Sequence, residues 1–582
     1  MNTARESPLT ALGSLRRHWW VWVAAALALA KLALLRAQPI YAIGNAIHDD
    51  QLFLKLARSI ADGQWLGPYD NLTLAKGPVY PAFVALNHFL GLPLRFTEEL
   101  VYIAACALAV RALRPLALAG WACLLVFATL LVNPLTYEGQ EMTRILRQHL
   151  TVPFALLVCA ALVGLALRRD RGFVARLPWA LLFGLTLGLF WLTREEGIWI
   201  LGMVAFLSAL AFSPLAIGPA RGRTLALLLS AVAAAAAPYL TVASLNERHY
   251  GWFGPSEFHA RDFRDAYGAL VRVRVGPQYP YIAVTREARE AIYSVSPAFA
   301  ELRPFLEGKI GYDWADGTAF HREERQIAAG WFMWAFRDAV AAAGHYSSAR
   351  EALAFYRRIA DEVNRACDQG RIPARGPRSG FAPPWHPEHA AAIRHGVPLF
   401  LRGAFDFSGF EPNPPESIGT DDEVRIFRDI THDRISPAPR ATYIELPAQR
   451  RLDAAKLDLL RWLGRNIGPW LTSLIVLAHL AAFVRFVQLV RARQFSWPFA
   501  FAVGAWAGGA GSSRSTSSST RLRSRTSMPR PTRRRSRCCS SSPCWSPSMP
   551  RAPGMRRWRR PLGAPASSLP ASRAQRGRPA SA

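Results

Sequence analysis

The chain has 582 residues, of which 51% are hydrophobic, and it carries a formal net charge of +29. This composition is only slightly more apolar than that of a soluble protein, but the apolar residues gather in long runs, which excludes a wholly soluble enzyme. The charge does not indicate nucleic-acid binding, because residues 512–582 hold 17 arginines and no other charged residue, which leaves +12 for the rest. We therefore expect no nucleic-acid partner.

Eight apolar runs, several of them long enough to cross a bilayer, predict membrane-spanning helices. In chain order they cover residues 18–36, 97–113, 116–133, 150–167, 176–192, 197–217, 224–245 and 469–490. The first run also fits a cleaved secretory signal. We interpret it as an uncleaved anchor, because it contains Lys31 and further runs follow it.

The orientation follows from the arginines, which gather in every second short loop. They lie at residues 111–114, 168–176, 221–223 and 491–493, and loops of this kind remain in the cytoplasm. The pattern predicts a multi-pass protein of a bacterial inner membrane, with a cytoplasmic N-terminus at residues 1–17. It places the acidic motifs on the periplasmic, extracytoplasmic side.

The runs also divide the chain into predicted domains. These are a seven-span module, a large outer domain, C-terminal spans and a tail, at residues 18–245, 246–468, 469–511 and 512–582. Apolar residues three and four apart predict helices in the outer domain at residues 285–306, 321–343 and 348–369. The predicted fold class is mostly α: a polytopic transmembrane helical bundle with a mostly helical extracytoplasmic domain inserted between the seventh and eighth spans.

The tail has a composition of its own, dominated by Ser, Arg and Pro, which cannot bury enough apolar surface to fold. One interpretation is a disordered basic tail. The other is an out-of-frame translation, because the 65 Arg against five Lys suggest a GC-rich gene whose shifted frames would give these residues. Both interpretations stay open.

The loop after the first run contains His48, Asp49 and Asp50, followed by a segment whose apolar residues fall on one helical face: Leu52, Phe53, Leu56 and Ile60. This pattern predicts an amphipathic helix on the membrane surface, with Asp50 as a candidate N-cap. A cap needs only one acid. The second acid therefore suggests a carboxylate held at the interface for catalysis.

The same loop continues into residues 75–81, where Gly77, Pro78 and Pro81 predict a tight, poorly helical backbone. Lys76 and Tyr80 lie in this segment. A lysine is a compact point charge well suited to phosphate, and it stands here in a chain that has only five lysines against 65 arginines. The alternative is a lysine that reaches toward lipid headgroups.

Two later outer loops carry further charges. Arg144 and Arg147 are three residues apart and would share one face of a helix. Arginines on the outer side run against the usual trend, which suggests an anionic partner, either Glu138 and Glu141 or a bound phosphate. The turn at residues 193–197 holds three more charged residues, which are either solvated or contact a substrate: Arg194, Glu195 and Glu196.

These features over residues 18–245 together resemble the GT-C superfamily of membrane glycosyltransferases, which includes protein O-mannosyltransferases and lipid A aminoarabinose transferases. The resemblance implies a polyprenyl-phosphate sugar donor, catalytic acids at Asp49 and Asp50, and donor-phosphate binding by Lys76, Arg144 and Arg147. Candidate substrate contacts are His48, Tyr80, Glu138, Arg194, Glu195 and Glu196. The chain departs from the family in having fewer later spans and its outer domain between the seventh and eighth.

The predicted function is transfer of a sugar from a polyprenyl-phosphate donor to an extracytoplasmic acceptor of the cell envelope, which could be a glycan, a lipid or a protein. The carboxylates could bind a divalent cation, but the sequence does not require a cofactor. His386, His389 and His395 match no strong zinc pattern. The main alternative is a transporter or lipid flippase, which would keep charges within the membrane, whereas here they fall in predicted loops. A third is a catalytically silent membrane protein whose outer domain binds a partner.

Overall fold

The computed structural model describes residues 19–194, 197–212, 221–279, 281–315, 320–381, 390, 393–399, 406–437 and 447–493. The predicted N-terminal segment, the tail at 512–582 and the histidines at 386 and 389 lie outside these residues. Within them the chain is helical, with isolated β-bridges in place of strands. The expectation of a mostly α fold is confirmed.

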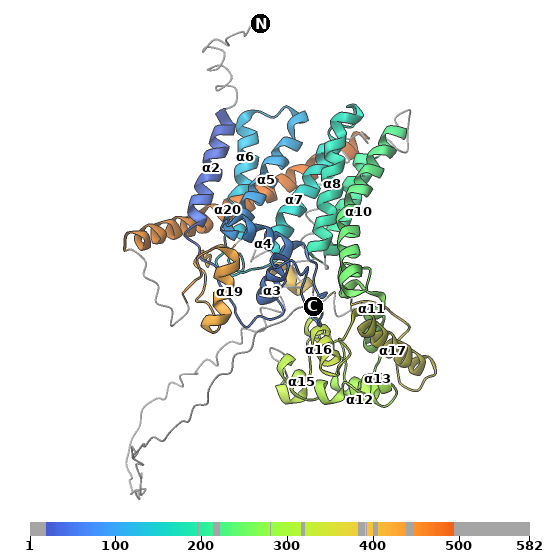
Figure 1. Cartoon of the computed structure of the whole chain (residues 1–582). Coiled ribbons are helices and arrows are strands. Elements are labelled where there is room, and N and C mark those ends of the chain that lie inside the picture. Colours follow the sequence, from blue (N-terminus) through green and yellow to red (C-terminus); the bar gives the residue numbers. More distant parts are fainter. Residues whose placement is uncertain are drawn as a thin grey trace, which may run out of the picture. The chain divides into compact units, whose positions relative to one another are not determined.

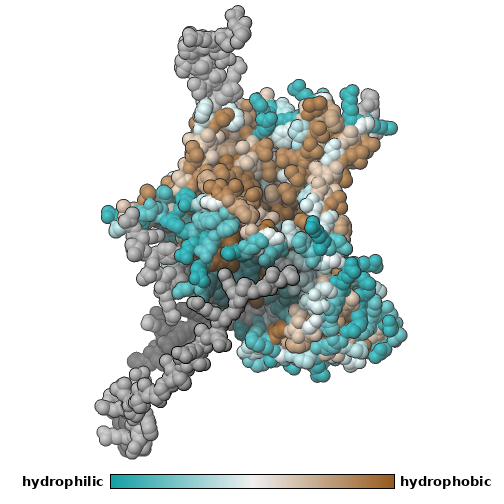
Figure 2. Space-filling model, in the orientation of Figure 1, coloured by the Kyte–Doolittle hydropathy of each residue, from teal (hydrophilic) through white to brown (hydrophobic). Residues whose placement is uncertain are grey.

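Each of the eight predicted spans overlaps a helix. These helices are α2 (Trp19–Leu35), α5 (Leu94–Ala112), α6 (Gly120–Leu131), α7 (Gln148–Ala166), α8 (Phe173–Thr193), α9 (Leu201–Phe212), α10 (Arg221–Tyr250) and α20 (Pro447–Arg491). Four helices among the described residues are long and apolar enough to cross a membrane, namely α7, α8, α10 and α20. Figure 2 shows hydrophobic residues gathered over the bundle formed by α2, α5 to α8 and α10.

The other four of these helices, α2, α5, α6 and α9, differ from the expectation in two ways. Helices α2, α6 and α9 are apolar but have fewer than 18 residues. Helix α5 is long enough, but it contains Arg95, Glu98 and Glu99, which are all buried against other parts of the protein. A further short apolar helix, α4 (Val79–Leu90), was not predicted.

The bundle depends on close contact between α8 and α10, which run side by side in Figure 1. Gly184 and Gly188 of α8 face the backbone oxygens of Ala231 and Ala235 of α10 so closely that a Cβ at either glycine would collide with them. Small residues four apart allow helix backbones to approach in this way. The spacing of the glycines therefore sets the distance between these helices.

The outer domain has one hydrophobic core built by short helices. They are α11 (Arg261–Arg272), α12 (Arg286–Tyr293), α13 (Pro297–Ala300), α14 (Arg303–Leu306), α15 (Lys309–Trp314), α16 (Ala329–Ala342) and α17 (Ala349–Asp368). The single helix predicted at 285–306 is wrong. Its segment divides into α12, α13 and α14, because Ser296 caps a new helix and Pro297 and Pro304 each lie in the first turn of one.

The end of the predicted outer domain packs elsewhere. Helix α19 (Asp421–Thr431) shares a hydrophobic core with the first outer loop, through Phe427 and Ile430. Ile40 and Ile435 form a parallel bridge in the same region. Helix α20 begins at Pro447 and runs through Pro469, so the predicted boundary at 468 lies inside a continuous helix.

Candidate active site

The candidate site centres on the first turn of α3 (Asp50–Ala61), the amphipathic helix that the sequence predicted. Its apolar side chains are buried against protein: Leu52 and Leu56 pack on the chain at Leu66 and Leu74, while Phe53 packs with α4 and α19. The apolar face that was expected to meet the membrane therefore contacts protein. Neither acid caps the helix through its side chain. Asp49 occupies the N-cap position but its side chain forms no capping hydrogen bond with the helix, and Asp50 is the first helical residue.

Asp50 is fully buried and forms two hydrogen bonds with one arginine. Arg144 donates from Nε to Oδ1 at 3.2 Å and from Nη2 to Oδ2 at 2.5 Å. Burial raises the pKa of Asp50 above its usual 3.8, although Arg144 opposes this. A charged fork on a buried carboxylate fixes both groups, so Asp50 holds the guanidinium of Arg144 in place.

Asp49 differs in exposure, since its side chain is 52% exposed while the Lys76 side chain is 4% exposed. The ammonium of Lys76 donates to Asp49 Oδ1 and to the backbone oxygen of His48. It also lies 4.9 Å from the ring centre of Phe53 and 5.3 Å from that of Trp334. The site thus offers a solvent-facing carboxylate beside a buried cation enclosed by aromatic rings.

His48 connects this site to the outer domain. Its Nε2 lies 3.4 Å from Asp338 Oδ2, and its ring meets Trp314 and Trp334 edge to face at 4.9 and 5.2 Å between centres. Asp338 also accepts from the amide of Asn71 at 2.7 Å and from the indole of Trp314 at 2.8 Å. The side chains of α15 and α16 therefore form one wall of the site.

A second contact between the loop and the outer domain lies beside this wall. Glu257 and Arg337 are both fully buried and form an ion pair at 2.7 Å. Tyr69 donates to Glu257 at 2.6 Å, and Arg337 donates through Nε to the backbone oxygen of Asn71 at 3.1 Å. These bonds fix the loop that carries Lys76 against α16.

The residues of the later outer loops lie near the same helix end. Residues 137–147 form turns instead of a helix, so Arg144 and Arg147 do not share a helical face. Arg147 nevertheless lies 5.8 Å from the Phe53 ring centre and donates to the backbone oxygen of Thr193 at 3.3 Å. The expected segment around Lys76 also differs, because Val79 begins α4.

The other candidate residues of the later loops do not form one group with these arginines. Glu138 accepts from the backbone amides of Gln140 and Glu141, so it holds its own turn. Glu141 lies 3.8 Å from Arg144, which agrees with one of the two anionic partners suggested for this arginine. Arg194 ends α8, while Glu195 and Glu196 lie outside the described residues.

Tyr80 belongs to a buried polar network that sequence reasoning missed. Its hydroxyl donates to Glu98 at 2.8 Å, and His149 and Arg95 lie 3.4 and 3.7 Å from the other carboxylate oxygen of Glu98. Three members of this network, Arg95, Glu98 and His149, line a small cavity of about 20 Å³. Tyr80 therefore faces protein side chains, and its hydroxyl is already bonded.

Charges also lie inside the bundle, contrary to the expectation that they stay in loops. Lys31 of α2 pairs with Glu99 of α5 at 2.8 Å and donates to Thr136 at 2.9 Å. The spacing of Glu98 and Glu99 in an apolar run was the available signal. Asp338 and Trp334 gave no comparable signal, because their partners in the first loop, among them His48 and Lys76, lie more than 250 residues away in the sequence.

A metal site is not formed among the residues that the structure describes, where no three His, Cys, Asp or Glu side chains gather. Asp49 and Asp50 face different cations, Lys76 and Arg144. The described residues therefore bring together Asp49, Asp50, Lys76, Arg144 and Arg147, with His48 at one edge. This arrangement can accept a proton and stabilise a phosphate anion.

Comparison with known proteins gives a fold-level similarity only. No family model matches the chain, and no curated protein sequence does. Two similar solved structures are crystal structures of ArnT from Cupriavidus metallidurans, one bound to undecaprenyl phosphate and one in the apo state. Their identities are 14% and 13% and their TM-scores 0.29 and 0.32, and each alignment covers 86% of this chain and 78% of that chain.

Proposed function

We propose that the chain is a membrane glycosyltransferase that moves a sugar from a polyprenyl-phosphate donor to an acceptor outside the cytoplasm. The observation that carries this proposal is the pair formed by Asp49 and Lys76. A half-exposed carboxylate lies directly beside an almost fully buried ammonium, at the end of an apolar bundle. A sugar phosphate needs both groups, one for the acceptor's proton and one for the departing phosphate.

In the proposed reaction Asp49 accepts the proton of an acceptor hydroxyl as its oxygen attacks the anomeric carbon. The bond between that carbon and the phosphate oxygen breaks, and the lipid leaves as a phosphate. Negative charge grows on the phosphate during this step, so a cation placed before the reaction lowers the barrier. Lys76 supplies this cation after exchanging its contact with Asp49 for the phosphate.

Asp50 has a different role in this proposal, that of a positioning residue. It is buried and holds Arg144 through two hydrogen bonds, so it is not available to take a proton from an acceptor. Arg144 keeps Nη1 on the side of Glu141 and presents it to the donor phosphate. Arg147, whose guanidinium lies 5.8 Å from the ring centre of Phe53, extends the same positive region.

The placement on the outer side of a bacterial inner membrane rests on the arginine-rich loops. Arg111, Arg114 and Arg168 lie at the ends of α5 and α7, whereas Asp49 and Lys76 lie beside the opposite end of α7. Since arginine-rich short loops stay in the cytoplasm, the candidate site faces outward.

A direct test measures the product that every donor of this class shares. Purified full-length chain in proteoliposomes is incubated with a panel of polyprenyl-phosphate sugars and acceptor extracts, and released polyprenyl phosphate is quantified by mass spectrometry. We expect release by the wild type and slower release, by about 10²-fold or more, by Asp49→Asn. Release that is equal in both proteins, or absent with every donor, contradicts the proposal.

The buried charges of α2 and α5 favour a second candidate, a lipid flippase. Lys31 and Glu99 form an ion pair between these helices, and ionisable residues within membrane helices often mark transport routes. A flippase moves a fluorescent polyprenyl-phosphate lipid between leaflets without releasing polyprenyl phosphate from a sugar. The same proteoliposomes distinguish the two functions.

A further inference from the structure

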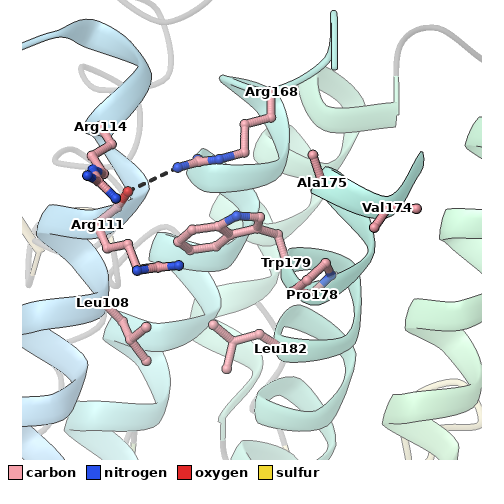
Figure 3. Close-up of a pocket in the computed structure, with 9 residues that line it drawn as sticks. All are labelled: Leu108, Arg111, Arg114, Arg168, Val174, Ala175, Pro178, Trp179 and Leu182. Atoms are coloured by element: carbon pink, nitrogen blue, oxygen red, sulfur yellow. Dashed lines mark hydrogen bonds between the residues drawn. The ribbon is translucent and has the colours of Figure 1, made fainter. Parts of the chain in front are cut away.

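A pocket of about 440 Å³ lies at the other end of the bundle, where α5 and α7 end and α8 begins. Three arginines and one tryptophan border it: Arg111, Arg114, Arg168 and Trp179 (Figure 3). It shares no residue with the candidate active site, which lies beside the opposite ends of α7 and α8. The proposed glycosyl transfer gives it no role.

Arg168 is fixed by the protein itself. Its guanidinium donates to the backbone oxygens of Ala112, Gly164 and Arg111 at 3.0, 2.9 and 3.1 Å. It also lies 4.5 Å from the ring centre of Trp179. Figure 3 shows the Arg111 side chain extending toward the same ring. The pocket therefore has a rigid cationic side.

The positive charge of the pocket is not balanced by acids. Among the described residues, no ion pair joins Arg111, Arg114 or Arg168 to a carboxylate, and the nearby Asp170 pairs with Arg169 at 3.7 Å. Burial, followed by the charges of Arg111 and Arg114, lowers the pKa of the Arg168 guanidinium. An anion in the pocket would relieve this repulsion.

The apolar border indicates which anion fits. Leu108 and Leu182 line the pocket below the arginines, and Val174 at its edge has a side chain that is 82% exposed. A free phosphate would leave this apolar border in water, whereas a lipid would cover it with acyl chains. Basic pockets between membrane helices on the cytoplasmic side bind anionic headgroups in this way.

We propose that this pocket binds the phosphate headgroup of an anionic membrane phospholipid from the cytoplasmic leaflet. Arg111 and Arg114 contact the phosphate beside the fixed Arg168, and the acyl chains lie along Leu108 and Leu182.

The test uses native mass spectrometry of the purified full-length chain with phosphatidylglycerol, phosphatidylcholine or inorganic phosphate. Arg168 is left unchanged, because its bonds hold two helices together. The variants are R111A/R114A, which removes the charge, and R111K/R114K, which keeps it. R221A/R223A is the matched control, since these exposed arginines begin α10 outside the pocket.

We expect the wild type to prefer phosphatidylglycerol over phosphatidylcholine by about 30-fold, the effect of two arginines near a headgroup. The preference should vanish in R111A/R114A, persist in large part in R111K/R114K and stay unchanged in R221A/R223A, with equal thermal unfolding in all proteins. An unchanged preference in R111A/R114A overturns the proposal. Binding of inorganic phosphate without any preference between the lipids overturns it too, and assigns the pocket to free anions.

Discussion

The substitution of Asn for either of two adjacent acids should have opposite consequences. In Asp50→Asn, Arg144 loses the charge of its buried partner and one of its two hydrogen bonds, while the amide oxygen keeps the other. Breaking a fully buried ion pair costs about 3–5 kcal/mol. The cost here should be lower, about 2 kcal/mol, because one charge-assisted bond is lost and a buried carboxylate no longer has to be desolvated.

In Asp49→Asn the changed side chain is half exposed, and its amide oxygen still accepts from Lys76. The free energy of unfolding should therefore fall by less than about 1 kcal/mol. Sugar transfer should fall by about 10²-fold or more, the usual contribution of a general base. Asp50→Asn should unfold more easily but keep more activity per folded molecule than Asp49→Asn.

The assay combines thermal unfolding in detergent with release of polyprenyl phosphate by each purified variant. The wild type and Asp50→Asn are compared at several pH values. Because the pKa of Asp50 is raised above 3.8, the folded state binds this proton more tightly than the unfolded state does. The stability it contributes is complete below pH 3.8 and is lost as the pH rises through the raised pKa. The advantage of the wild type over Asp50→Asn should therefore grow as the pH falls toward 3.8.

Near-normal transfer by both single variants would contradict the role of Asp49 as the base. A lower stability of Asp49→Asn than of Asp50→Asn would contradict the greater structural role of Asp50. A constant stability difference across this pH range would contradict the burial of Asp50 as the cause of its shifted pKa.

Three further predictions concern the donor, the bundle and the topology. Lys76→Ala should raise the apparent KM for the lipid donor by about tenfold or more, because one charge-assisted bond to the phosphate is lost. The measurement is a titration of donor and of acceptor. A change in the acceptor's KM alone would show that Lys76 does not bind the donor. Gly184→Leu should cost about 1–3 kcal/mol, because its side chain meets the backbone of α10; thermal unfolding equal to that of the wild type would contradict this contact. Cys367 is buried and its pKa is raised by that burial, so an impermeant maleimide should label it slowly from outside. A cysteine introduced by Ser294→Cys, at an exposed position, should be labelled rapidly. Labelling of Ser294→Cys only after the cytoplasmic side is opened would contradict the predicted topology.

Local patterns were enough to predict several elements. The amphipathic spacing after Asp50 predicted α3, and helix α17 agrees with the periodicity at 348–369. The acids and Lys76 were found because residue type and loop position alone suggested phosphate chemistry. These features depend on residues that are neighbours in the sequence.

Other features depend on contacts that no local pattern contains. The partner of Asp50 is Arg144, and the indole over Lys76 comes from Trp334, so the geometry of the site is set by distant segments. The face of α3 looked suited to lipid because its apolar residues have the same spacing whether they meet lipid or protein. Charged residues were expected in loops. The acids of α5 lie inside the bundle because Glu99 pairs with Lys31 and Glu98 lies beside His149.

The candidate site is built from two separate segments of the chain, and the aromatic wall over Lys76 comes from the second. Asp49 and Lys76 come from the first outer loop, whereas Trp314, Trp334 and Asp338 come from the outer domain. A fragment that ends before the outer domain would retain the charges but expose Lys76 to water, where the attraction between charges is far weaker. The outer domain thus keeps water away from the Lys76 ammonium. Its loss would abolish activity without changing any of the charged residues.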